Sequence, residues 1–119
     1  NSTQNLQSEL SQFIGTEKYY RITQRHLLTD GTKYLAEQAK SYWLMDAIAS
    51  YLPALINREH FVVASLAVKN QSALLLLTDG NYKDIASQRI LYTDFPMPDI
   101  TLFACWTTDY WVLILPSEY

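Results

Sequence analysis

LLTDGTKYLAEQAKSYWLMDAIASYL, residues 27–52, is the stretch that decides the fold. In its second half, apolar side chains recur with helical spacing in two adjacent stripes, which leave a narrow polar strip carrying Asp46 and Ser50. A helix that is apolar over most of its surface is largely buried. We therefore expect a helical layer that supports the rest of the chain. Pro53 either ends this helix or opens a short new turn.

The start and the middle of this stretch carry helix signals. Asp30 or Thr32 can accept hydrogen bonds from the free N–H groups of a first turn, and Gly31 permits a sharp entry. Ser41 can cap a second helix, so a break near Lys40 is expected. The pattern predicts a helical hairpin or a kinked helix.

The residues before this stretch give one clear signal and one ambiguous one. Residues 1–14 have apolar positions at helical spacing and predict a short amphipathic helix that Gly15 can end. Residues 16–28 fit a helix or a strand equally well, and both interpretations stay open.

After His60 the apolar pattern changes from helical to extended. Five strands are predicted, at residues 61–69, 73–78, 88–92, 100–107 and 110–115. Because their links are short, we expect an antiparallel meander of roughly five strands. The fold class is then α+β, a single domain over residues 1–119, with residues 1–60 helical and residues 61–119 forming the sheet.

Both faces of this predicted sheet require cover. ALLLL at residues 73–77 and WVLIL at residues 111–115 do not alternate between apolar and polar, as strands with one wet face do. The N-terminal helix, a second copy of the protein or a separate partner could cover the second face.

Composition excludes several classes of protein. With 49% hydrophobic residues in 119, the chain is not disordered, and no apolar run is long enough to cross a membrane. No secretory signal opens the sequence, and Cys105 is the only cysteine, which fits a cytoplasmic protein. The net charge of −3 lies in residues 61–119 and argues against broad nucleic-acid binding.

The sequence shows no glycine-rich phosphate loop and no ligand spacing for zinc, so no cofactor and no metal site are predicted. Four residues could line a pocket between helices and sheet: Tyr42, Asp46, His60 and Cys105. Each also has a plain structural interpretation. Asp46 fits a surface or capped carboxylate, and Cys105 fits a core thiol among apolar neighbours.

Basic and aromatic residues lie close together in one segment, at Lys18, Tyr19, Tyr20, Arg21 and Arg25. Such residues can contact phosphates and stack on bases. The alternative is a solvated cationic surface beside buried tyrosines, which suits the acidic chain better.

Three segments together carry a resemblance: TEKYYR at residues 16–21, TDGTKYLAEQAKSYWLMDAIASY at residues 29–51, and YTDFPMPDITLF at residues 92–103 with the later LPSEY. They resemble a family of small uncharacterised bacterial proteins, often cyanobacterial or carried by plasmids or phages. The resemblance implies no catalytic residue.

Three functions remain as hypotheses. The first is a small non-enzymatic protein that binds a protein partner or forms a homodimer through an apolar sheet face, as a regulator or inhibitor of the kind that mobile elements carry. The second is an enzyme or small-ligand binder that uses the pocket candidates. The third is an RNA or DNA binder that uses the basic and aromatic segment.

Overall fold

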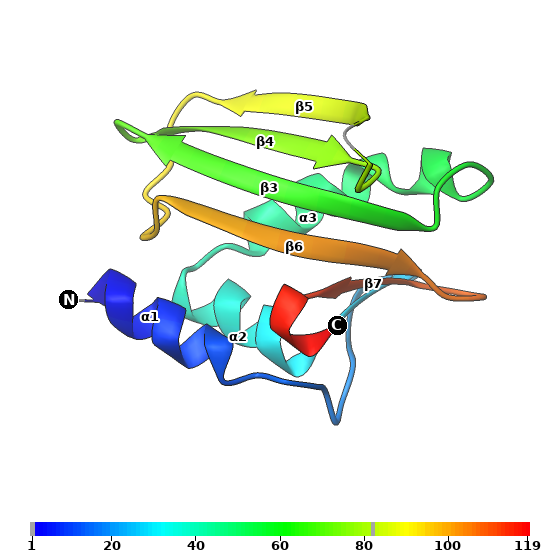
Figure 1. Ribbon diagram of the computed structural model, residues 1–119, viewed down its shortest axis with the longest axis horizontal. Coiled ribbons are helices and arrows are strands. Elements are labelled where there is room, and N and C mark those ends of the chain that lie inside the picture. The colour runs from blue at the N-terminus through cyan, green and yellow to red at the C-terminus, as the bar shows by residue number, and fades with distance from the viewer. Residues whose placement is uncertain (1, 82) are drawn as a thin grey trace.

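A computed structural model describes residues 2–81 and 83–119, with side chains from Leu6 onward; Asn1, within the predicted helix 1–14, lies outside the described residues (Figure 1). The helices are α1 (Ser2–Ser11), α2 (Asp30–Gln38) and α3 (Tyr42–Tyr51), with short 3₁₀ helices η1 (Pro53–Leu55) and η2 (Pro116–Glu118). The strands are β1 (Tyr20–Thr23), β2 (His26–Leu28), β3 (Phe61–Lys69), β4 (Ser72–Thr78), β5 (Asp84–Ile90), β6 (Asp99–Trp106) and β7 (Trp111–Ile114).

The predicted five-stranded antiparallel meander is wrong, although the fold is α+β. The structure has one mixed sheet of seven strands in the order β1-β2-β7-β6-β3-β4-β5. Strands β1 and β2 lie within the first 60 residues, which were expected to be helical, and β2 pairs with β7 in parallel. The other neighbouring strands pair antiparallel.

The loop of residues 91–98 explains why β6 does not lie beside β5. It carries the chain back across the sheet to the free edge of β3, where Val68 N–H donates to the Pro98 carbonyl at 2.8 Å. Phe95 and Met97 of this loop are buried in the core. Their burial stabilises the return connection, which replaces the predicted β5–β6 hairpin.

The expected break between two helices is present. Lys40 adopts the left-handed conformation with φ 51° between α2 and α3, and Ser41 occupies the N-cap position of α3. The Ser41 hydroxyl does not cap α3 but donates to the Leu35 carbonyl at 3.4 Å. The N-cap of α2 is Thr29 and not Asp30: the Thr29 side chain accepts from the Thr32 N–H, and the Thr32 hydroxyl accepts from the Thr29 N–H in return.

One face of the sheet forms the core with the helices. Figure 1 shows α3 behind β3 and β6, and α1 beside α2. In the central strands alternate residues point to this side and are buried, among them Val62, Ala64 and Leu66 of β3. Leu6 and Leu10 place α1 in the same core cluster. The N-terminal helix therefore does not cover the second face.

Among the described residues, no helix is both long enough and apolar enough to cross a membrane.

Candidate functional site

The sheet face turned away from the helices carries apolar side chains that the structure leaves partly uncovered. No helix crosses in front of β3 and β4 in Figure 1. We call this surface the open face. The apolar side chains larger than alanine that strand register places there and that stay at least partly exposed are Phe61, Val63, Leu74, Leu76, Phe103, Cys105 and Ile114. Leu74 is 46% exposed, and the others are half-buried.

An aromatic cluster lies at one end of the open face. The rings of Phe61 and Phe103 have centroids 5.0 Å apart, and the ring of Tyr119 lies 5.4 Å from each. The tilted and edge-to-face arrangements are those that aromatic pairs prefer. Tyr119 itself stays 72% exposed, so it covers only part of the open face.

Cys105 belongs to the open face rather than to the core. Register places it between Phe61 of β3 and Val112 of β7, and its side chain is half-buried. Burial raises the pKa of the Cys105 thiol above its ordinary value. A raised pKa lowers the thiolate fraction at neutral pH, so this position does not activate a nucleophile.

The four pocket candidates do not meet in space. Tyr42 and Asp46 are exposed on α3, on the opposite side of the sheet from Cys105. His60 is exposed just before β3, and its Nε2 lies 2.8 Å from the Ile56 carbonyl oxygen. None of these residues lines any of the four main surface hollows of the described chain.

The basic and aromatic segment is divided between several environments. Tyr20 donates to Asp30 at 3.0 Å and has Lys33 Nζ over its ring at 4.8 Å, so Lys33 occupies one face of the ring. The hydrogen bond to Asp30 raises the pKa of the Tyr20 phenol. Lys18 and Tyr19 are exposed in the segment before β1.

Asp30 does not cap α2; its carboxylate binds the segment that leads into β1. Its carboxylate accepts from the Glu17 N–H at 2.9 Å as well as from the Tyr20 hydroxyl. These donors favour the ionised form, and the Glu17 N–H contributes most to lowering the pKa of Asp30. The segment of residues 16–20 is therefore tied to the start of α2.

Arg21 and Arg25 come together in a polar hollow of about 240 Å³. We call it the arginine hollow; its lining is Arg21, Gln24, Arg25, Asp109 and Tyr110. The first three come from the β1–β2 hairpin and the last two from the β6–β7 turn. Sequence reasoning found the two arginines but not Asp109 and Tyr110, because no local pattern shows that residues more than 80 positions apart meet.

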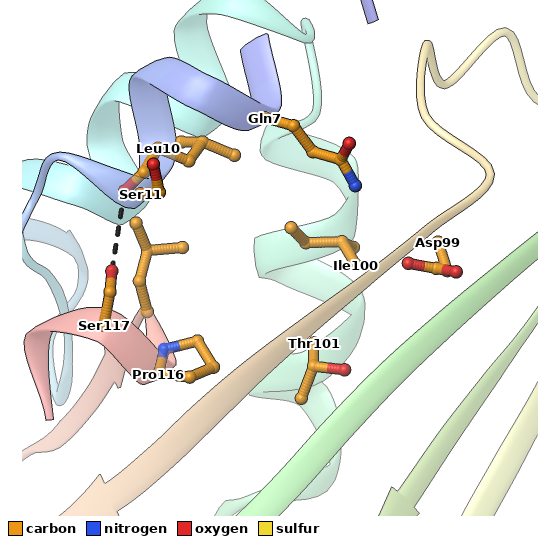
Figure 2. A pocket seen from close by; sticks show the side chains of 9 residues that line it. Gln7, Leu10, Ser11, Asp99, Ile100, Thr101, Pro116 and Ser117 are labelled. Carbon is orange, nitrogen blue, oxygen red and sulfur yellow. Dashed lines mark hydrogen bonds between the residues drawn. The ribbon is translucent and has the colours of Figure 1, made fainter. Parts of the chain in front are cut away.

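A second hollow, of about 260 Å³, lies between α1, the start of β6 and η2. Figure 2 shows Leu10, Ile100 and Pro116 around it, with Gln7 and Asp99 at its rim. The Ser117 hydroxyl donates to the Leu10 carbonyl at 3.5 Å. Apolar carbon dominates this lining, and no pair of titratable groups faces across it.

Sequence reasoning also missed the carboxylate of Glu118, which is 8% exposed. It accepts from the Thr29 hydroxyl at 2.6 Å, from the Gly31 N–H at 3.0 Å and from the Leu115 N–H at 3.1 Å. A carboxylate at the first turn of α2 also interacts favourably with the helix dipole. Glu118 therefore joins the LPSEY segment to the start of α2 by hydrogen bonds.

The described residues contain no group of three or more His, Cys, Asp or Glu side chains placed to hold a metal ion. No curated protein and no solved structure matches the chain. The family model of DUF6876, a family of unknown function, matches residues 4–119, and the chain therefore belongs to this family.

Proposed function

We propose that this chain is a non-enzymatic protein that binds another protein through the open face. The proposal depends on one observation: no helix of the described residues covers the apolar side chains that β3, β4 and β6 place on the open face. Contiguous apolar surface of this kind marks interaction sites on soluble proteins.

The composition of the open face supports this proposal. It combines aromatic and aliphatic side chains, and the polar side chains that register places among them at the centre are uncharged: Ser65, Thr78, Ser87 and Thr101. The charged Arg89 and Asp99 lie nearer its edge, opposite Leu74 and Ala67. The centres of protein interfaces are depleted in charge and enriched in aromatic residues. The scattered positions of Tyr42, Asp46 and His60 give no comparable support to an enzyme or a small-ligand binder.

The resemblance to small proteins of mobile elements extends the proposal. A regulator or inhibitor that acts by occupying another protein's surface needs a docking face and no catalytic group. The open face would serve that role.

A charge placed at the centre of the open face tests the proposal. Leu76→Lys puts an ammonium group on the open face beside Leu74, between Ser65 and Ser87 of the neighbouring strands, where a docked protein would have to desolvate it. Ser50→Lys is the matched control, because Ser50 is exposed on α3 on the other side of the sheet. Circular dichroism checks that both variants fold.

The readout is the set of proteins retained by immobilised wild type, together with the molar mass in solution by light scattering. We expect Leu76→Lys to lose the wild-type assembly or partner and Ser50→Lys to keep it. The proposal fails if wild type is monomeric and retains nothing, or if both variants behave like wild type.

A further inference from the structure

We propose that the arginine hollow binds the phosphate group of a small molecule. The inference does not depend on the open face. It rests on two turns that meet at one end of the sheet and on the arginines they bring together.

The two turns are fixed relative to one another by the backbone. Strands β2 and β7 run parallel, and His26 stands beside Trp111 in their register. The Trp111 N–H donates to the Arg25 carbonyl at 2.8 Å, one residue before that pair. Because the β1–β2 hairpin and the β6–β7 turn both precede this point, their side chains face the same hollow.

The Arg21 guanidinium is held before any ligand arrives. It donates to the Gln24 carbonyl at 3.0 Å and to the Tyr110 hydroxyl at 3.4 Å, and it lies 5.4 Å from the centroid of the Tyr110 ring. A guanidinium has five N–H donors, so several remain for a ligand. Holding the group in place reduces the entropy that binding would cost.

Neither arginine is neutralised within the described residues. The salt bridge found there joins Lys33 and Glu37, and no carboxylate lies within 4.0 Å of Arg21 or Arg25. Asp109 lines the hollow without forming an ion pair. Two guanidinium groups beside one carboxylate leave a net positive site on a chain of charge −3.

These features indicate a phosphate group, since arginine forks match phosphate oxygens in geometry. Asp109 can accept a hydrogen bond from a hydroxyl of the ligand next to the phosphate group, a contact that inorganic phosphate cannot make. The volume is below the roughly 300 Å³ at which pockets for drug-sized ligands begin, so the hollow suits a single group. Residues 61–119 carry the net negative charge and would repel a long polyanion.

The experiment follows the backbone amide shifts of the folded protein by NMR during titration with inorganic phosphate, glycerol phosphate, acetate and oligothymidylate. The variants are Arg21→Ala, Arg25→Ala and Asp109→Asn. Arg58→Ala is the control, because Arg58 is an exposed arginine in the turn after η1.

We expect saturable shifts around Gln24 and Tyr110 with both phosphate ligands, at millimolar concentrations. Arg21→Ala and Arg25→Ala should each weaken binding about tenfold, the usual loss for one charged hydrogen bond, and Arg58→Ala should not. Asp109→Asn should tighten the binding of inorganic phosphate, because it removes a like charge.

Three results would each overturn the proposal. One is the absence of saturable shifts with either phosphate. Another is equal binding of acetate and phosphate. The third is tighter, steeply salt-dependent binding of oligothymidylate, which would assign the hollow to a nucleic acid.

Discussion

At the scale of single residues, the buried carboxylate of Glu118 has the clearest energetic role. Its three donors come from Thr29, Gly31 and Leu115, all of them buried. Glu118→Ala leaves these donors without their acceptor, and we expect the free energy of unfolding to fall by about 2 to 4 kcal/mol. Urea denaturation measures the change.

Glu37→Ala is the control for that measurement. This substitution also removes a close contact, the salt bridge to Lys33 at 3.1 Å, but both partners lie on the solvent-exposed surface of the same helix. Such pairs contribute about 0.5 kcal/mol or less. Equal losses in the two variants would contradict the role given to Glu118.

His26 is the residue whose titration should affect stability. Its ring is 6% exposed, its Nε2 has no hydrogen-bond partner, and burial lowers its pKa below 6.5. The unfolded chain therefore binds the proton more tightly than the folded one. The stability that His26 contributes is complete above the unfolded pKa and is lost as pH falls through the folded pKa.

We expect the unfolding free energy of wild type to fall as pH decreases below 6.5 and the fall to be smaller in His26→Leu. His60→Gln, at the exposed histidine, should keep the wild-type slope. Urea titrations at several pH values measure these slopes. A His26→Leu slope identical to that of wild type would show that His26 is not the group responsible.

At the scale of elements, the junction between α2 and α3 has a measurable strain. Lys40 has φ 51°, which costs a residue with a Cβ atom roughly 1 to 2 kcal/mol. Lys40→Gly should raise the unfolding free energy by about 1 kcal/mol, because glycine adopts this conformation readily. Lys40→Ala separates this effect from loss of the lysine side chain, and it should not stabilise. Thermal and urea unfolding of both variants provide the comparison.

The entry of α2 shows why its glycine could be noticed from the sequence but not explained. A Cβ at Gly31 would lie 2.6 Å from Glu118 Oε1 and 2.5 Å from Leu115 Cδ1. Both neighbours are buried, so neither side chain can move aside at little cost. Gly31 is required for close approach of the LPSEY segment, a contact across more than 80 residues that no helix signal contains.

The helices and strands β3, β4, β5 and β6 were predictable for a local reason: each is long enough to display its apolar period. Strand β7 has four residues, but all of them are apolar and Pro116 follows closely, so it too was predictable. Strands β3 and β4 begin and end within one residue of the prediction. Strands β1 and β2 have four and three residues, too few to distinguish a strand from a helix. The order of the strands was wrong because it depends on burial of Phe95 and Met97 in the return loop, a tertiary contact.

At the scale of the whole molecule, the helices and the LPSEY segment cover the sheet unequally. The helices pack on one face, while Tyr119 lies over the aromatic end of the open face. The sequence showed that both faces of the central strands are apolar. It did not show which face would stay uncovered, because α1 has an apolar stripe that would fit either side.

The contribution of the Tyr119 ring, which partly covers the open face, can be measured by comparing it with a second exposed tyrosine. Tyr119 and Tyr92 are 72% and 68% exposed, but only Tyr119 makes ring contacts with Phe61 and Phe103. Tyr119→Ala should lower the unfolding free energy by about 1 to 2 kcal/mol, because two aromatic pairs are lost. Tyr92→Ala should change it by less than about 0.5 kcal/mol, as expected for a surface residue.

The same pair of variants tests whether Tyr119 limits access to the open face. Removing its ring uncovers Phe61 and Phe103, so Tyr119→Ala should bind more of a fluorescent anilinonaphthalene dye than wild type, while Tyr92→Ala should match wild type. Cys105, paired with Phe61 across β3 and β6, gives a second readout through its rate of reaction with a maleimide. If dye binding and the rate of Cys105 modification both stay unchanged, Tyr119 does not limit access to the open face.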